Sequence, residues 1–157
     1  MSLSFIKREI KESALLEWKE EYSKSKKSRH YSQFESSPRW KAYKKTVKKK
    51  TWSAYIQLKI GHGYFRSYLA RLPEHSTDKC YTCKTRENPE HLILHCKATR
   101  AIREELKQEF NIEEFSLKNL FNTKNGQEFL FKFLEKTQVS TRNWLLQQAS
   151  LEIEDEE

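Results

Sequence analysis

The stretch CYTCKTRENPEHLILHC, residues 80–96, decides the fold that we expect for this chain. It holds all three cysteines of the protein and follows the pattern Cys-x2-Cys-x7-His-x4-Cys through Cys80, Cys83, His91 and Cys96. Zinc takes thiolate and imidazole ligands in a tetrahedral arrangement, and a Cys-x2-Cys turn places two sulfurs on one metal ion. The pattern therefore predicts a structural Zn2+ site, because four protein ligands leave no open position for a substrate.

Two residues are candidates for the fourth ligand of this predicted site. On a regular helix residues four apart share a face, which favours His95 beside His91, whereas residues five apart diverge by about 140°. Against this geometry, thiolates bind zinc strongly, and Cys96 would otherwise be a buried spare thiol. We predict Cys96 as the ligand, with His95 as its alternative. The alternative to any metal is that the three cysteines are simply buried in a small core.

Apolar residues recur at three- and four-residue steps along most of the chain, which predicts an all-α fold. Only 3 glycines and 3 prolines are present among 157 residues, too few for the turns of an all-β protein. We expect a small helical domain with a zinc knuckle and a basic, partly irregular N-terminal arm. Its segments are an amphipathic helix, basic arm and helical pair over 1–79, the knuckle and following helix over 80–110, C-terminal helices over 111–151, and an acidic tail over 152–157.

Several of these helices have apolar stripes that predict which side is buried. A first helix beginning near Ser4 would pack through Ile6, Ile10, Ala14, Trp18 and Tyr22. A second helix would pack through Trp52, Ile56 and Ile60, with Tyr55, and end at Gly61. The residue that follows, His62, is interpreted as part of the helix end, with a metal ligand or a nucleic-acid contact as alternatives.

The remaining helices have sequence signals for their starts. Residues 84–87 should be polar and exposed, and Asn88 and Pro89 should begin a helix. That helix would continue through an apolar stripe of Leu94, Ala98, Ile102, Leu106 and Phe110. A short helix near Leu120 and another near Leu130 should be separated by a turn over 122–126, and Ser140 or Thr141 should cap the last helix.

Positive charge is concentrated in the first half of the chain. Residues 1–79 carry 19 Lys and Arg against 8 Asp and Glu, whereas residues 80–157 carry 11 against 14. The densest part, Lys24 to Lys50, has eleven basic residues and one acidic residue, Glu35. A cationic half favours a polyanionic partner, and nucleic acid is the first class to consider.

Aromatic residues are interleaved with this charge, a combination typical of single-strand binding. We predict contacts to RNA or single-stranded DNA from Lys26, Lys27, Arg29, Tyr31, Trp40, Tyr43, Lys44, Lys45, Lys48, Lys49 and Lys50. In this set the cations would meet phosphates, and the three rings would stack on bases. The alternative is a solvated loop whose rings anchor it to the helical core. A protein-interaction module and a product with no selected activity are the two alternative functions.

Other classes of function lack the residues that they need. We find no Ser/His/Asp arrangement, no phosphate-binding glycine loop and no paired carboxylates outside helical surface positions, and we predict no enzyme. No run of about 18 apolar residues and no secretory signal is recognised, so we expect no membrane association. Three cysteines clustered with histidine favour a reducing compartment, and we expect an intracellular protein of the nucleus or cytoplasm.

Three stretches in this order resemble a known family. They are LLEWKEEYSKSKKSRHY at 15–31, LKIGHGYFRSYLARL at 58–72 and CYTCKTRENPEHLILHC at 80–96. Together they resemble the C-terminal segment of LINE-type (non-LTR) retrotransposon polyproteins, of the kind common in fungal genomes, which follows the reverse transcriptase and RNase H region. The resemblance extends from Ser4 to about Arg103, and beyond Phe110 it ends.

The resemblance implies Cys80, Cys83, His91 and Cys96 as zinc ligands, and so supports Cys96 over His95. It also implies a role near element RNA or target DNA. It does not imply enzymatic activity, since RNase H chemistry needs clustered carboxylates that hold magnesium, and neither these nor reverse transcriptase motifs are present.

Overall fold

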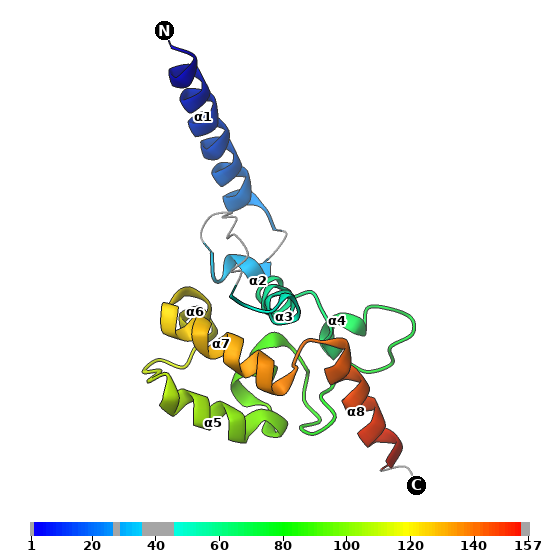
Figure 1. The fold of residues 1–157 in the computed structure, drawn as a ribbon. Coiled ribbons are helices and arrows are strands. Elements are labelled where there is room, and N and C mark those ends of the chain that lie inside the picture. The colour runs from blue at the N-terminus through cyan, green and yellow to red at the C-terminus, as the bar shows by residue number, and fades with distance from the viewer. Residues whose placement is uncertain (1, 27–28, 36–45, 155–157) are drawn as a thin grey trace. The chain divides into compact units, whose positions relative to one another are not determined.

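A computed structural model describes residues 2–26, 29–35 and 46–154 of the chain (Figure 1). Contacts divide the chain into two compact units, which we call unit 1 (Met1–Ala42) and unit 2 (Tyr43–Glu157). The predicted all-α class is confirmed, because about 67% of the described residues are helical. Within the described ranges the only β pairings outside named strands are the isolated bridges Tyr64 to Ser140 and Lys79 to Arg86.

The described part of unit 1 contains a long helix, α1 (Leu3–Lys24), and a single turn of helix, α2 (Arg29–Ser32). The N-cap of α1 is Ser2, whose hydroxyl accepts the backbone N–H of Phe5, and the predicted Ser4 lies inside the helix. No residue of α1 is buried, so the described part of unit 1 does not bury the apolar stripe predicted to pack. Tyr22 at its end is the exception, since its hydroxyl donates to the backbone oxygen of Glu35.

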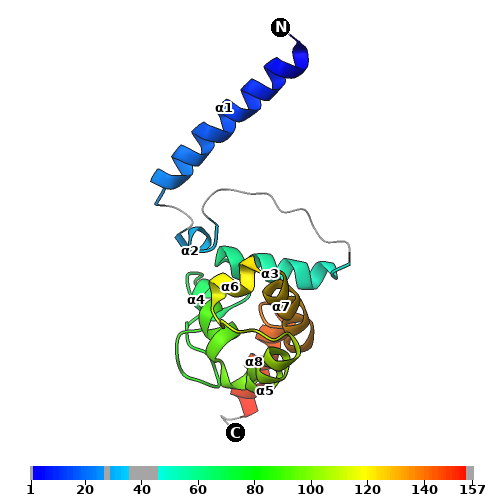
Figure 2. The ribbon, with the colours of Figure 1, turned by 90° about the vertical axis from the view of Figure 1, so that its left-hand side faces the viewer.

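The core of unit 2 is built around α7 (Lys124–Thr137). Three helices pack on it, namely α3 (Lys49–Ile60), α5 (Arg100–Glu109) and α6 (Leu117–Asn122) (Figures 1 and 2). Aromatic rings interlock at these contacts, as when Tyr55 of α3 meets Phe121 of α6 at 5.4 Å and Phe131 of α7 at 5.0 Å between centroids. The core is thus a close-packed aromatic and leucine interior.

The helix predicted after residue 50 is present, and of its predicted packing residues Tyr55 is buried, whereas Trp52, Ile56 and Ile60 are not. Tyr55 and Leu58 point into the core with 2% and 0% exposure, while Ile60 is 38% exposed. The reason is that Tyr55 inserts between α6 and α7, which turns the predicted stripe of Trp52, Ile56 and Ile60 toward the edge of the interface. Gly61 ends the helix in the left-handed conformation at φ 74°, as predicted.

The turn predicted over 122–126 is shorter than expected. Thr123 caps α7 by accepting the backbone N–H of Gly126, so the helix begins at Lys124. Gly126 is buried against α6, where an added Cβ would lie 2.5 Å from the Cα of Leu120. Only glycine lets the two helices approach this closely.

The last helix, α8 (Arg142–Glu154), follows α7 after a sharp change of direction. Gln138 and Ser140 take left-handed conformations at φ 58° and 59°, and Thr141 caps α8 by accepting the N–H of Trp144. Thr141 is therefore the cap among the two candidates. The helix continues to Glu154, so the first residues of the expected acidic tail are helical. No helix in the described ranges has the length and apolar character needed to cross a membrane.

Candidate metal centre

A tight turn holds Cys80 and Cys83. The Cys80 N–H donates to the Thr85 oxygen at 2.7 Å, and the Lys84 N–H donates back to the Cys80 oxygen at 2.8 Å. Lys84 adopts φ 55°, a left-handed conformation that closes the turn. An isolated antiparallel β-bridge between Lys79 and Arg86 joins the two ends of the loop. These bonds fix both sulfur-bearing residues on one small loop.

A π-helical turn, η1 (His91–His95), begins at the third predicted ligand, His91, and ends directly before the fourth, Cys96. Asn88 starts it as predicted, since its side-chain oxygen accepts the His91 N–H at 2.8 Å. The Cys96 N–H then donates to the His91 oxygen at 2.7 Å, five residues back. Because a π turn closes on residue i+5, it returns Cys96 to His91 where a regular helix would carry it away.

The chain leaves the helix at Cys96, which has an extended backbone at ψ 127°, and a 3-10 turn, η2 (Lys97–Thr99), leads into α5. Because of this break, residues before and after Cys96 do not belong to one continuous helix and do not share one face. The continuous stripe predicted from Leu94 to Phe110 is therefore wrong, since Ala98 is exposed and only Leu106 of the set is fully buried.

The turn and the π segment bring the four predicted side chains together. One donor atom from each of Cys80, Cys83, His91 and Cys96 lies within 4.8 Å of all the others. The Cys80 and Cys96 sulfurs are 3.8 Å apart, and none of the cysteines forms a disulfide. Two sulfurs on a tetrahedral zinc with bonds of about 2.3 Å would lie about 3.8 Å apart. The donor set and its spacing fit a zinc ion.

Burial and unused hydrogen-bonding capacity support this fit. Cys80 and Cys96 are completely buried, and His91 is 8% exposed. The Nδ1 atom of His91 lies 3.3 Å from the Thr85 hydroxyl, whereas its buried Nε2 atom has no hydrogen-bond partner. A buried ring nitrogen without a partner is costly unless a ligand takes it, and Thr85 supplies the outer contact that orients metal-binding histidines. His95 is exposed and does not belong to the cluster.

The pKa values of the neighbouring thiols Cys80 and Cys96 are shifted in opposite directions. The contact with Cys96 lowers the pKa of Cys80 against the effect of burial, with help from hydrogen bonds to the backbone of Cys83. The same contact, together with burial, raises the pKa of Cys96. Loss of a proton is therefore easier at the Cys80 sulfur than at the Cys96 sulfur. A metal ion bound to both sulfurs would favour the thiolate form of each.

Cationic and N–H groups surround the sulfurs. The Lys97 backbone N–H donates to the Cys83 sulfur at 3.3 Å. Arg103, 4% exposed, donates from Nη1 to the Cys96 oxygen at 3.0 Å and to the Thr99 hydroxyl at 3.3 Å. Three thiolates and a neutral imidazole around Zn2+ carry a net charge of minus one, which a buried guanidinium would balance. Sequence analysis missed Arg103, because its role depends on the helix break at Cys96.

Glu87 joins the cysteine loop to α4 (Arg66–Leu69). Its carboxylate accepts the Arg66 N–H at 3.0 Å, and its backbone bonds to Ser67 and Asp78. Residues 84–86 are exposed as expected, but Glu87 is 0% exposed, so the prediction for this residue is wrong. Burial raises the pKa of Glu87 to about 7, although the Arg66 N–H opposes the shift. The first N–H groups of α4 need an acceptor, and Glu87 provides it inside the protein.

The residues predicted to contact nucleic acid are only partly within the described ranges. Lys27, Trp40, Tyr43, Lys44 and Lys45 lie outside them, and of Arg29 the backbone alone is described. Lys26, Lys48, Lys49 and Lys50 are exposed. Tyr31 is half-buried, and its ring lies edge-on to the ring of Tyr22 in α1, with centroids 6.5 Å apart.

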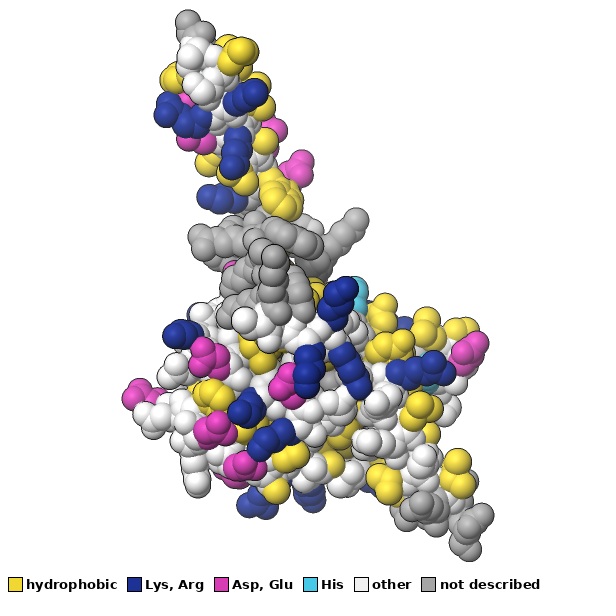
Figure 3. Space-filling view, in the orientation of Figure 1, with side chains coloured by type: hydrophobic (Ala, Val, Ile, Leu, Met, Phe, Trp, Pro, Cys, Tyr) yellow, Lys and Arg dark blue, Asp and Glu magenta, His cyan; other side chains and the backbone are white. Residues whose placement is uncertain are grey.

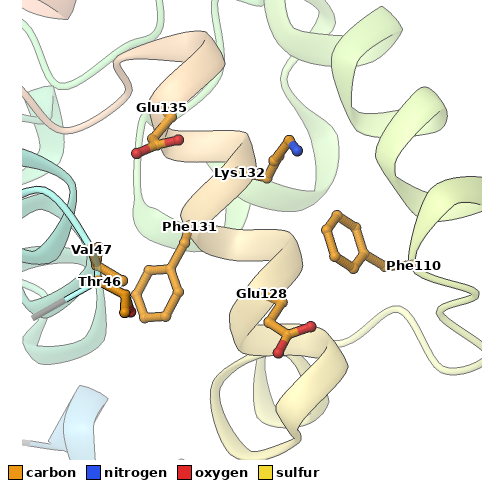
Figure 4. A pocket seen from close by; sticks show the side chains of 7 residues that line it. All are labelled: Thr46, Val47, Phe110, Glu128, Phe131, Lys132 and Glu135. Atoms are coloured by element: carbon orange, nitrogen blue, oxygen red, sulfur yellow. The ribbon is translucent and has the colours of Figure 1, made fainter. Parts of the chain in front are cut away.

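A hollow of about 330 Å3 lies between α7 and the residues that precede α3 (Figure 4). Glu128 and Glu135 of α7 flank Lys132 there, and Phe131 faces the opposite wall near Val47. Lys48 lies 3.9 Å from Glu135. Two carboxylates repel phosphate, so this hollow is a poor phosphate site.

The face of unit 2 in Figure 3 has two kinds of surface. Lys and Arg alternate with Asp and Glu over α5 and α7, partly as ion pairs such as Lys136 with Glu105 at 2.7 Å. Apolar side chains gather instead toward α4 and α8, where Leu72, Leu146 and Ile153 are 48%, 54% and 64% exposed. The surface over α5 and α7 is therefore charged with both signs, whereas the surface toward α4 and α8 is partly apolar.

Comparison with known proteins adds no relative: no family model, no curated protein and no solved structure matches this chain. Its candidate site is therefore defined by its own residues, as a group of three thiols and one imidazole in metal-binding proximity, of which all but Cys83 are buried.

Proposed function

We propose that Cys80, Cys83, His91 and Cys96 hold a structural Zn2+ ion in a non-catalytic module that binds nucleic acid. The observation that supports the metal is the approach of four donor atoms to within 4.8 Å of one another, at a tight loop and a π turn. The ion would supply folding energy by joining the loop at 80–83 to the start of α5. With four protein ligands it would offer no position to a substrate.

The nucleic-acid part of the proposal rests on charge. The first 79 residues carry an excess of eleven positive charges, and Lys48, Lys49 and Lys50 are exposed at the start of α3. Such a cluster would bind phosphates and release counterions, so affinity would fall steeply with salt. RNA or single-stranded DNA is favoured, because aromatic residues are interleaved with the basic ones.

One experiment tests both parts on one sample. Protein purified without chelator should contain one zinc per chain and bind a single-stranded oligonucleotide with salt-dependent affinity. Changing Lys48, Lys49 and Lys50 to Gln should flatten the slope of log affinity against log salt by about 2, at about 0.7 per phosphate contact. The matched control changes Lys118, Lys124 and Arg142, which are also exposed, and should leave the slope unchanged. Zinc-free protein, or equal slopes for both triple variants, would contradict the corresponding part.

The origin and the lack of catalysis are also proposals. The three ordered stretches at 15–31, 58–72 and 80–96 support descent from the C-terminal segment of a LINE-type polyprotein. On this proposal the purified protein neither extends a primed template nor cleaves RNA in an RNA–DNA hybrid. Either activity in protein free of contaminating nucleases and polymerases would contradict it.

A second candidate function is protein interaction, and the exposed apolar side chains on α8 favour it. Leu146, Leu151 and Ile153 are 54%, 42% and 64% exposed on one short helix. Such residues are uncommon as a group on a surface without a partner. On this candidate, Leu146→Glu with Ile153→Glu would abolish self-association or partner binding and leave zinc content unchanged.

A further inference from the structure

A second hollow of unit 2 lies beside the loop that follows α3 and has a composition unlike that of the first. It measures about 430 Å3 and is lined by Gln57, His62, Gly63, Tyr64, Tyr68, Leu69, Leu72 and His75. None of these lining residues is acidic. Its volume lies in the range of small-ligand sites, and its walls are mostly rings and leucines.

The Tyr68 ring in this hollow has planar side chains close to it. The His62 ring is stacked on Tyr68, with centroids 4.8 Å apart and planes at 24°. The guanidinium carbon of Arg71 lies 5.4 Å from the centroid of the same Tyr68 ring. His62 and Tyr64 are both exposed, so their outer surfaces are accessible. The arrangement joins aromatic faces with a cation, the two elements that single-strand binding sites use.

The backbone around these rings is held firmly. The Tyr64 N–H donates to the Gln57 side chain at 3.1 Å, and Tyr64 pairs with Ser140 in an isolated bridge. An added Cβ on Gly63 would lie 2.3 Å from the same Gln57 side chain, so glycine permits this contact. The loop from α3 to α4 is therefore fixed by α3 and by the junction before α8, which suits a preformed binding site.

We propose that this hollow binds one unpaired nucleobase of a single-stranded nucleic acid, stacked against His62 and Tyr64, with Arg71 contacting a neighbouring phosphate. The inference rests on the proposed nucleic-acid function and adds a base-stacking site inside unit 2. Stacking tolerates any base, because every base has a π face. The site therefore supplies affinity for unpaired strands without sequence specificity.

The test compares two oligomers that share phosphates and differ in bases: a 12-mer of deoxyadenosine and an abasic 12-mer. Wild-type protein should bind the adenosine oligomer about tenfold more tightly. Tyr64→Phe keeps the ring and should bind like wild type. Tyr64→Leu keeps apolar volume but no ring, and should lose about tenfold for the adenosine oligomer and nothing for the abasic one. Gln147→Ala, on an exposed residue of α8 outside the hollow, is the control.

Three results would overturn the inference in distinguishable ways. If Tyr64→Leu binds the adenosine oligomer like wild type, this site is wrong while salt-dependent binding still supports the proposed function. If Tyr64→Phe and Tyr64→Leu weaken binding equally, the contribution of Tyr64 comes from its hydroxyl group and not from stacking of its ring on a base. If wild-type protein binds neither oligomer at low salt, the proposed function fails together with the site.

Discussion

Two regions of unit 2 are held together by different means. The cysteine region, residues 80–99, has only a tight turn, a π turn and a 3-10 turn, and its buried atoms include two sulfurs, an imidazole nitrogen and a carboxylate. The aromatic core around α7 consists of longer helices with interlocked rings, such as Phe129 and Phe133 at 5.8 Å. The first region buries polar groups that need a partner beside the apolar Leu92 and Ile93, whereas the second region depends on packing alone.

This difference teaches which changes each region should tolerate. A packed core is sensitive to added or removed volume but contains little that responds to metal or pH. A polar cluster responds to the loss of an ion or a proton, because each unsatisfied buried group costs free energy. The two regions meet where α5 follows the cluster and packs on α7.

Removing the metal should have the largest effect and should separate the two regions. Structural zinc in small domains supplies on the order of 10 kcal/mol of apparent binding free energy. After chelation, backbone amides at 80–99 should lose protection from hydrogen exchange, and those of α7 should keep most of theirs until global unfolding. Added zinc should restore the protection. Unchanged exchange at 80–99 in metal-free protein would contradict this account.

Glu87 should make the stability of the cysteine region depend on pH. The folded pKa is about 7 and the ordinary value is 4.5, so the folded state holds this proton more tightly than the unfolded state. Its contribution to stability is fully present below about pH 4.5 and is lost as pH rises through about 7. Glu87→Gln cannot ionise and should be more stable than wild type by on the order of 3 kcal/mol at pH 8.

Denaturant titrations at several pH values test this effect. The stability difference between Glu87→Gln and wild type should shrink as pH falls toward 5. Glu90→Gln is the matched control, because Glu90 is exposed on the neighbouring turn and should show no such trend. A constant difference across the pH range would mean that Glu87 is ionised in the folded protein throughout.

Gly126→Ala should damage the aromatic core and spare the cluster. The new methyl group would lie 2.5 Å from the Leu120 Cα and 2.7 Å from the Asn119 oxygen, so α6 must move away from α7. Overpacking of this kind costs about 2 kcal/mol, measured by thermal or denaturant unfolding. Asn125→Ala, on the exposed side of the same turn, should be nearly neutral. Loss of zinc from Gly126→Ala would show that the two regions are not independent.

Arg103→Gln should give the smallest effect, confined to the metal. It removes a cation that donates to the Cys96 oxygen, and outer contacts of this type contribute 10- to 100-fold to metal affinity. We expect about tenfold weaker zinc binding in a competition assay with a chelator. Arg100→Gln, an exposed cation of the same helix, should bind zinc like wild type.

Local sequence signals predicted much of this structure. The helical class, the end of α3 at Gly61, the cap at Asn88 and the cap at Thr141 all follow from residues that act on their own neighbours. The donor set of the cluster was also readable, because Cys80, Cys83, His91 and Cys96 have metal-ligand spacing within 17 residues.

Features that depend on distant contacts could not be read in the same way. The π turn at His91 has no sequence signal, yet it alone brings Cys96 back to His91 and breaks the stripe predicted to Phe110. Glu87 is polar in sequence but buried, because it accepts an N–H from α4, 21 residues away. The buried face of α3 likewise depends on where α6 and α7 lie.

Cobalt substitution measures the central claim most directly, since Co2+ bound to thiolates absorbs light through sulfur-to-metal charge transfer. Wild-type protein and His95→Asn should give the same spectrum of a tetrahedral site with three sulfurs and one nitrogen, at one ion per chain. Cys96→Ser should lose charge-transfer intensity and bind the metal far more weakly. An unchanged spectrum for Cys96→Ser, together with a loss for His95→Asn, would contradict the account and identify His95 as the fourth ligand.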